Sequence, residues 1–263
     1  MEQFFTPAPE SKADRRRAEI LRILMEEGGS TVIKDLAGRL EVSLMTVHRD
    51  LNDLQEQGLV RRVRGSVSAE KTMLFESSYI YRSRQKVQEK KRLARAVVAH
   101  LSPGNAIMWD DSSTTYHLCD YIEEVTPVTV ITNSLPVMER LHDVAEVDLI
   151  ALGGKYHRGY RGFFGMACER AIRGYHVDVA LLSATTIQGL SLYTQDEQVV
   201  RTKLAMMEVA RRKILLVDDS KFHFTALMHV AELTAFDIVL IGGQVDGEHL
   251  RRLEDAGIKY QLV

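Results

Sequence analysis

The spacing of apolar residues divides the chain into two parts with different patterns. In the first part, apolar residues recur every three or four positions in three short stretches, as they do in amphipathic helices. The predicted helices span residues 15–27, 31–40 and 43–57. Ser43 is a good N-cap for the third of them, and Gly58 follows it as a C-terminal cap glycine does. Residues 59–64 and 67–69 then alternate like two strands around a Gly65-Ser66 turn.

From about residue 89 the pattern changes to short apolar runs bounded by polar or glycine turns, with helical stretches between several of them. The predicted strands are 106–109, 128–132, 148–152, 179–183, 214–218 and 238–241. Short buried strands that alternate with helices indicate an α/β domain with a mostly parallel, doubly wound sheet. The three helices and the hairpin before it are typical of a winged helix-turn-helix. The predicted organisation is a flexible arm (1–14), a winged helix-turn-helix domain (15–69), a linker (70–88) and an α/β domain (89–263).

Composition excludes a few classes of protein. The chain has 263 residues and a formal net charge of −2. It has no apolar run near the roughly 20 residues that cross a bilayer. Its first residues lack the basic start and apolar core of a secretion signal, so we expect a cytoplasmic protein. Cys119 and Cys168 show no metal-binding spacing and are expected to be free thiols. The histidines show none either, so no metal or cofactor is predicted.

The third predicted helix has one apolar and one polar face. At about 100° per residue, its apolar residues Leu44, Val47, Leu51 and Leu54 fall on one side. Its outward N-terminal half presents Ser43, Thr46, His48 and Arg49. Hydroxyl, imidazole and guanidinium groups suit contacts to phosphates and to base edges, and a helix fits the major groove of DNA. A surface helix of any small helical domain would also show this pattern, so the helix alone does not decide the function.

Clustered arginines near this helix favour DNA binding. Arg61, Arg62 and Arg64 lie on the predicted hairpin, where they would contact the DNA backbone or the minor groove. Arg15, Arg16 and Arg17 start the first helix and are candidate phosphate anchors. Such charge clusters are also common on solvated faces, which remains the alternative for each of them.

Residues 41–65 resemble the signature of the DeoR-type repressors, VS-x-x-T-[IV]-R-R-D-[LI]-x-x-L-x-x-x-G-x-[LIV]-x-R. The matching residues are Val42, Ser43, Thr46, Val47, Arg49, Asp50, Leu51, Leu54, Gly58 and Arg62. The chain departs from the family at His48, which replaces an arginine. It also departs at the hairpin turn, where Arg64-Gly65-Ser66 replaces His-Gly-Gly. Because His48 is a pH-sensitive contact, the operator sequence cannot be taken from the family.

The resemblance covers nearly the whole chain. It implies that the C-terminal domain is similar to the ribose-phosphate isomerase fold and binds a phosphosugar or related metabolite without converting it. The family motif D-x-G-S-T-T, which follows a strand, here reads Asp110-Asp111-Ser112-Ser113-Thr114-Thr115. A hydroxyl-rich turn before a helix offers free backbone N–H groups to a phosphate, and Asp110 or Asp111 would accept from sugar hydroxyls. A plain helix cap would fit the same residues. Ser112 replaces the family's glycine.

Further family landmarks follow in order along the chain. They are Thr132-Asn133-Ser134, Gly153-Gly154-Lys155-Tyr156, the helix start with Glu197, Val199, Val200 and Arg201, and Asp218, Ser220, Lys221 and Phe222. All except the helix start follow strand ends, where ligands bind in open parallel sheets. The resemblance thus implies effector contacts from Asn133, Gly153, Gly154, Lys155, Glu197 and Lys221, with Lys221 facing an anionic group. Ser183 and Thr186 replace family glycines, and Gly242-Gly243 replaces Thr-Asp, so the ligand itself stays open.

Three hypotheses follow. The first is a ligand-gated regulator that binds an operator in double-stranded DNA. Such a protein would repress a sugar or carbohydrate catabolic operon and would work as a dimer or a larger symmetric homo-oligomer. The second is a sugar-phosphate isomerase with an appended helical domain, in which Asp110, Asp111, Glu197 and Lys221 would perform acid–base chemistry. The third is a coupling protein that has lost DNA binding. An appended winged helix is hard to explain for an enzyme, so we favour the regulator and predict no catalytic residues.

Overall fold

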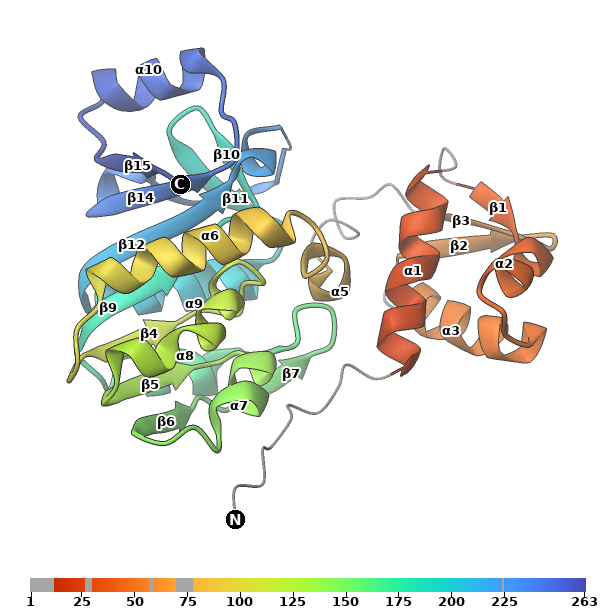
Figure 1. Cartoon of the computed structure of the whole chain (residues 1–263), viewed down its shortest axis with the longest axis horizontal. Helices are drawn as coiled ribbons and strands as arrows, with labels where there is room; N and C mark the ends of the chain where they lie inside the picture. The colour runs from red at the N-terminus through yellow and green to blue at the C-terminus, as the bar shows by residue number, and fades with distance from the viewer. Residues whose placement is uncertain (1–11, 27–29, 57–58, 70–77, 224) are drawn as a thin grey trace. The chain divides into compact units, whose positions relative to one another are not determined.

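The computed structural model describes residues 12–26, 30–56, 59–69, 78–223 and 225–263. They form two compact units, with the division between Gln85 and Lys86 (Figure 1). The predictions for the arm up to residue 11, for the cap glycine Gly58 and for linker residues 70–77 lie outside the described residues. Within these ranges, every helix is too short or too polar to span a bilayer.

The first unit has the elements of a winged helix-turn-helix. In chain order they are α1 (Lys12–Glu26), β1 (Ser30–Val32), α2 (Ile33–Arg39), α3 (Leu44–Glu56), β2 (Val60–Val63), β3 (Ser66–Ala69) and α5 (Tyr79–Arg82). The predicted second helix begins later than expected, at Ile33. The residues before it, Ser30–Val32, pair antiparallel with β3. That pairing depends on the hairpin, which lies more than 30 positions further along the chain, so the helical pattern of the segment could not reveal it.

The three predicted helices pack around one core, as their apolar stripes require. Its buried side chains include Ile20, Leu21, Leu24, Leu36, Val47, Leu51, Leu54, Leu59 and Val67. Leu44, expected on the inward face of α3, is instead 45% exposed. It is the first residue of α3, and the buried stripe of this helix begins only at Val47.

Part of the predicted linker is ordered structure. Residues 79–82 form the short helix α5, in which Tyr79 and Ile80 are buried. This helix packs against α1. The next helix, α6 (Val87–Val97), already belongs to the second unit. A connector was expected because the segment is polar and mixed, but a few buried side chains suffice to order so short a helix once α1 is present.

The second unit is built on a parallel sheet of seven strands, which confirms the predicted doubly wound α/β fold. The order is β15-β14-β12-β9-β4-β5-β6, and every pairing is parallel. The strands are β4 (Ala106–Trp109), β5 (Val128–Thr132), β6 (Val147–Ala151), β9 (Val177–Leu182), β12 (Ala210–Asp218), β14 (Ile238–Gly242) and β15 (Tyr260–Leu262). The chain runs outward in one direction from β4 and in the other from β9. The two central strands therefore form the topological switch point of the sheet.

Helices cover both faces of this sheet. One face carries α6, α7 (Leu135–Leu141) and the 3₁₀ helices η1 (Val98–His100), η2 (Thr115–Asp120) and η3 (Ile122–Val125) (Figure 1). The other carries α8 (Met166–Ile172), α9 (Glu197–Glu208) and α10 (Gly247–Asp255). Alternate residues of β12 enter the two cores, with Ile214 and Leu216 on the α6 side and Leu215 and Val217 on the other.

Smaller elements stand outside the main sheet. They are the hairpin β7 (Lys155–His157) and β8 (Gly162–Phe164), and a second sheet of β10 (Thr186–Gln188), β11 (Ser191–Thr194) and β13 (Met228–Glu232). Two more 3₁₀ helices, η4 (Asp219–Phe222) and η5 (Leu233–Ala235), follow β12 and β13. The β7–β8 hairpin bonds to the end of β5, because Phe163 N donates to the Asn133 carbonyl at 2.9 Å. The hairpin thereby lies next to the loops at the carboxyl edge of the sheet.

Candidate functional site

The recognition helix α3 is capped by the hydroxyl of Ser43. Ser43 Oγ accepts from the backbone N–H of Thr46 at 3.2 Å, which confirms Ser43 as the predicted N-cap. The hydroxyls of Ser43 and Thr46 also lie 2.9 Å apart and bond to each other. These two predicted DNA-binding residues therefore fix the start of the helix, while both hydroxyls stay close to solvent.

The outward face of α3 is exposed as predicted. His48 and Arg49 are exposed, as are Met45 and Asn52, which lie on the same face. The opposite face buries Val47, Leu51 and Leu54, along with one charged residue, Asp50. The helix thus presents a polar and accessible surface near its N-terminus, as recognition of a DNA groove requires.

Two arginines expected as phosphate anchors hold α1 against α3 instead. Arg16 forms a bidentate ion pair with the buried Asp50, with 3.1 Å between Nη2 and Oδ1. This hydrogen bond raises the pKa of Arg16. Arg17 pairs with Asp53 of α3 and with Asp14. Because these guanidinium groups are engaged inside the unit, the phosphate-anchor interpretation is corrected for Arg16 and Arg17. Arg15 remains exposed.

The wing arginines fall into two groups. Arg62 Nη2 donates to the carbonyl of His48 at 2.7 Å, so this side chain braces β2 against the recognition helix. Arg61 and Arg64 are exposed on the hairpin. Its two-residue turn is Arg64-Gly65, one position earlier than the predicted Gly65-Ser66, because Ser66 pairs with Val63 as the first residue of β3. The φ angles of Arg64 and Gly65 are 40° and 81°, as a type I′ turn demands. The side chains of Arg61 and Arg64 are therefore exposed on the wing, whereas Arg62 holds the wing in place against α3.

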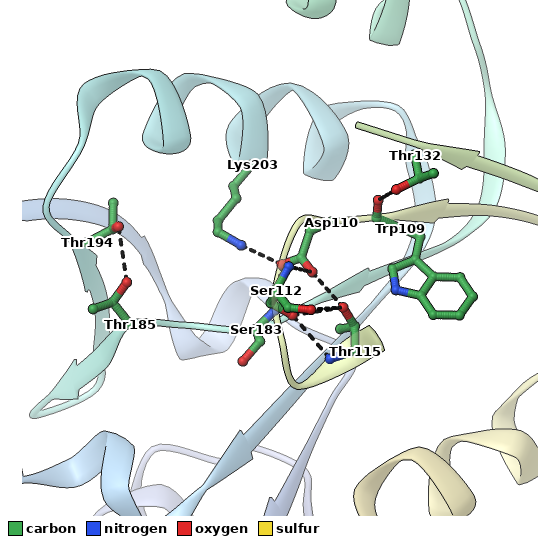
Figure 2. A network of polar contacts seen from close by, with 9 residues as sticks. All are labelled: Trp109, Asp110, Ser112, Thr115, Thr132, Ser183, Thr185, Thr194 and Lys203. Atoms are coloured by element: carbon green, nitrogen blue, oxygen red, sulfur yellow. Dashed lines mark hydrogen bonds and ion pairs between the residues drawn. The ribbon is translucent and has the colours of Figure 1, made fainter. Parts of the chain in front are cut away.

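In the second unit, a buried polar turn follows β4. All six residues from Asp110 to Thr115 are buried. Asp110 Oδ1 accepts from Ser112 N at 3.1 Å and from the Thr115 hydroxyl at 2.9 Å (Figure 2). The hydroxyls of Ser112 and Thr115 are 2.8 Å apart. The turn is thereby held by its own side chains, and Ser112, which departs from the family's glycine, supplies two of these bonds.

Asp110 also joins three elements of the fold. Its Oδ2 pairs with the ammonium of Lys203 on α9 and accepts from Ser183 N, at the end of β9, at 2.9 Å (Figure 2). Burial alone raises the pKa of Asp110. The Lys203 charge and these hydrogen bonds outweigh burial and hold that pKa below its usual range. The carboxylate is thus engaged within the protein, which favours a structural role for Asp110 over the predicted contact to sugar hydroxyls.

Two buried lysines near this turn were missed by the sequence analysis. Lys203 is 6% exposed, and Lys90 on α6 is 1% exposed. The ammonium of Lys90 donates to Ser113 Oγ at 3.1 Å. Each lysine occupies the apolar stripe of its helix, three positions before a buried residue, Leu93 for Lys90 and Met206 for Lys203. A lysine at an inward helical position was the available signal, because buried ammonium groups need a partner.

The end of β5 adds polar groups that are fully buried. Thr132, Asn133 and Ser134 are 0% exposed. The Thr132 hydroxyl donates to the Trp109 carbonyl at 2.7 Å (Figure 2). Asn133 Nδ2 donates to the Phe163 carbonyl at 3.0 Å. Asn133 Oδ1, Ser134 Oγ and Ser183 Oγ are buried at this edge without a hydrogen-bond partner among the described residues, as are Asp218 Oδ2 and Asp219 Oδ1 in the loop after β12. Buried polar groups normally find partners, so these atoms are suited to receive a polar ligand.

The loop after β12 contributes further charge at the same edge. Lys221 is 8% exposed, and its carbonyl accepts from the Thr186 hydroxyl at 2.8 Å. Asp219 pairs with Lys86 at 2.9 Å. Asp218 accepts from Ser220 N at 3.1 Å and so caps η4. Since β12, β9, β4 and β5 are neighbours in a parallel sheet, their carboxyl ends bring these loops together.

Other predicted effector residues lie outside this buried network. Glu197 is exposed and pairs with Arg201, one turn further along α9. The helix contributes Lys203 to the network in its place. Gly153, Gly154 and Lys155 are also exposed. A Cβ on Gly154 would stand 2.5 Å from the Phe164 carbonyl, so this glycine is required by packing against β8.

A hollow of about 430 Å³ lies at the opposite edge of the sheet. Its lining residues are Gly104, Pro127, Val128, Thr129, Glu146, Val147 and Asp148. It contains none of the predicted effector residues and no convergent set of buried polar groups. The described residues include no cluster of three or more His, Cys, Asp or Glu that would hold a metal ion.

Two family models match this chain, one for each unit. Residues 16–72 match the DeoR-like helix-turn-helix domain, and residues 85–242 match the DeoR C terminal sensor domain. An L-fucose operon activator of Haemophilus influenzae is 30% identical and aligns over 84% of this chain and 88% of its own length. The transcriptional repressor GlcR of Bacillus subtilis is 29% identical, over 86% and 87%.

A solved structure also matches about half of this chain, but only distantly. Ribose 5-phosphate isomerase A of Methanocaldococcus jannaschii shares 20% identity over 52% of this chain and 55% of its own, with a TM-score of 0.37. A similarity of that degree adds nothing about activity. Both matched domains are those of a regulator, and Asp110 and Lys203 neutralise each other in the network. The hypothesis of an isomerase with an appended helical domain is therefore not supported.

Proposed function

Because this chain belongs to the DeoR family of transcriptional regulators, we propose that it represses a sugar or carbohydrate catabolic operon until a phosphorylated sugar-like metabolite binds its second unit. The chain acts in the cytoplasm as a symmetric homo-oligomer, so that two recognition helices read two half-sites of an operator. The single observation that carries the proposal is the exposed, N-capped face of α3 bearing His48 and Arg49.

The DNA contacts divide by chemistry. Arg49 reads a guanine through O6 and N7, and His48 contacts a neighbouring base edge or phosphate. Ser43, the N-cap, and Thr46, whose hydroxyl bonds to it, contact the DNA backbone from the first turn of the helix. Arg61 and Arg64 on the wing neutralise phosphates or enter the minor groove.

The effector site lies at the carboxyl edge of the sheet, at the switch point between β4 and β9. The backbone of the turn after Asp110 and the cation of Lys221 receive the phosphate group. The unpartnered polar atoms of Asn133, Ser134 and Ser183 receive hydroxyls of the sugar part. A fixed set of donors and acceptors of this kind suits binding without turnover, because the main acid–base pair is already satisfied internally.

Helix α6 couples effector binding in the second unit to DNA binding by the first. This helix begins the second unit directly after the DNA-binding unit in the chain. Near its start it is bonded to two effector loops, through Lys90 to Ser113 and through Lys86 to Asp219. A ligand that moves these loops therefore moves the residues that lead into the DNA-binding unit. It shifts the regulator only through its different affinity for the two states.

Two measurements test the proposal. Fluorescence anisotropy with labelled promoter fragments from the source genome should reveal a bound operator, and a panel of sugar phosphates should include one that releases it. Arg49→Ala should abolish specific binding, whereas Arg170→Ala, an exposed arginine in the second unit, should leave it intact. A full chain that binds no promoter fragment, or Arg49→Ala with unchanged affinity, would contradict the proposal.

The effector site is tested with buried hydroxyls that have no hydrogen-bond partner in the part of the chain that the structure describes. Ser134→Ala and Ser183→Ala remove such groups, so they should leave the melting temperature and operator affinity unchanged. Each should raise the effector concentration needed for release about tenfold, the cost of a lost hydrogen bond to a polar ligand. Thr132→Val is the matched control, because it breaks internal bonds and should lower stability first. A normal effector response in both serine variants would place the ligand elsewhere.

A further inference from the structure

The most exposed large apolar side chain of the described residues lies on the recognition helix. Met45 is 82% exposed, at the second position of α3. It belongs to neither the core of the first unit nor the apolar stripe of the helix, which begins at Val47. As an apolar residue, Met45 does not stand out in the sequence among candidate DNA contacts.

Met45 shares a face with the polar groups proposed to read DNA. His48, Arg49 and Asn52 stand three, four and seven positions after it, and all of them are exposed. The capping hydroxyl of Ser43 and its bond to the Thr46 hydroxyl fix the turn from which Met45 projects. The N-terminal residues of a recognition helix are the ones that meet base edges in the major groove. Met45 therefore reaches the bases if Arg49 does.

The chemistry of the side chain restricts what it can read. A methionine thioether donates no hydrogen bond and accepts only weakly. In the major groove, the donors and acceptors of guanine, cytosine and adenine call for polar partners, whereas thymine alone presents a methyl group at C5. An unbranched, polarizable side chain can also adapt its rotamers to a small apolar target.

We propose that Met45 is a specificity-determining residue that selects thymine, through contact with its C5 methyl group, next to the base read by Arg49. The inference rests on the proposed DNA contact of α3 and adds to it one base preference. Arg49 supplies hydrogen-bonded recognition, and Met45 supplies apolar recognition on the same face of the helix.

The test removes the methyl group without changing base pairing. The full chain first selects its site from a pool of randomised duplexes, and each thymine of that site is then replaced singly by deoxyuridine. For the wild-type chain, at least one such replacement should weaken binding about fourfold, the value of one buried methyl-sized group. Met45→Ala should bind the unmodified site about fourfold more weakly and should be insensitive to deoxyuridine at that same position.

Controls separate the failure of this inference from failure of the proposed function. Met166→Ala removes an exposed methionine of the second unit and should match the wild type on every duplex. If Arg49→Ala loses binding while Met45→Ala keeps both the affinity and the deoxyuridine profile of the wild type, Met45 has no part in base selection. If Arg49→Ala also binds normally, α3 does not read the site at all and the proposed function fails with it.

Discussion

Lys86 and Asp219 are joined by an ion pair of 2.9 Å across 133 positions of sequence. Lys86 is the first residue of the second unit, and Asp219 lies beside Lys221 in the loop after β12. The hydrogen bond to Asp219 raises the pKa of Lys86, so the Lys86 ammonium keeps its charge over the physiological range. A loop of the proposed effector site is thus bonded to Lys86, the residue at which the second unit follows the DNA-binding unit in the chain.

Asp219→Asn is expected to weaken communication between effector and operator. The variant should bind operator DNA normally in the absence of effector but need about fivefold more effector for release, at the lower end of typical allosteric coupling. Anisotropy titrations of operator complexes with the effector measure this directly. Lys86→Gln should have the same effect, and the double variant should add nothing further. Additive effects would show that the two residues act separately.

The wing arginines should differ in the salt dependence of binding. Arg64→Ala should lower the slope of log affinity against log salt by about one, since one phosphate contact is lost. Arg62→Ala should weaken binding while it leaves the slope nearly unchanged, because this side chain positions the wing through the His48 carbonyl. Titrations over a range of salt concentrations distinguish the two. If Arg62→Ala lowers the slope of log affinity against log salt by a full unit, Arg62 contacts a phosphate after all.

The buried pair of Asp110 and Lys203 should behave as a structural unit. Asp110→Asn leaves the Lys203 ammonium buried opposite a neutral amide, and breaking such a pair costs about 3 kcal/mol or more. The melting temperature of the second unit should fall by roughly 6–12 °C. Asp110→Asn combined with Lys203→Met should regain more than half of this loss, because no buried charge then remains. Scanning calorimetry of Asp110→Asn, Lys203→Met and the double variant checks the cycle.

His117 gives the second unit a sensitivity to mild acid. Burial, reinforced by the nearby charge of Lys90, lowers the pKa of His117 to about 4 from an ordinary value of 6.5. Below pH 6.5 the unfolded chain takes up a proton that the folded chain refuses, so the free energy of unfolding falls as the pH falls. Between pH 6.5 and 5 this loss is up to about 2 kcal/mol.

Replacement of the histidine isolates that contribution. Thermal melts at pH 6.5 and pH 5 should show a smaller acid-induced loss for His117→Gln than for the wild type. His142→Gln, which changes an exposed histidine, should follow the wild type. If His117→Gln loses as much stability as the wild type, the acid sensitivity has another origin.

Much of the fold followed from local patterns. The apolar stripes of α1 and α3 and the strand-like runs of the second unit appear where their periods predicted, because helix and strand periods are properties of the nearest residues along the chain. The same reasoning placed Arg49 on the exposed face of α3 and Ser43 at its cap.

Pairing between distant segments did not follow from those patterns. Ser30–Val32 forms a strand only because it pairs with β3. On α9, Glu197 lies on the surface, whereas Lys203 forms an ion pair with Asp110. Arg16 forms an ion pair with Asp50 of α3 instead of contacting a DNA phosphate. Which partner a charged or polar side chain finds depends on three-dimensional neighbours that a sequence pattern does not name.

The sequence by itself therefore determined the kinds of element, the outward face of the recognition helix and the strand ends where polar loops gather. The tertiary structure alone decided which of those polar groups are satisfied within the protein and which remain open for a ligand. The physical reason is that period and capping act over one or two turns, whereas desolvation and ion pairing act between groups that only folding brings together.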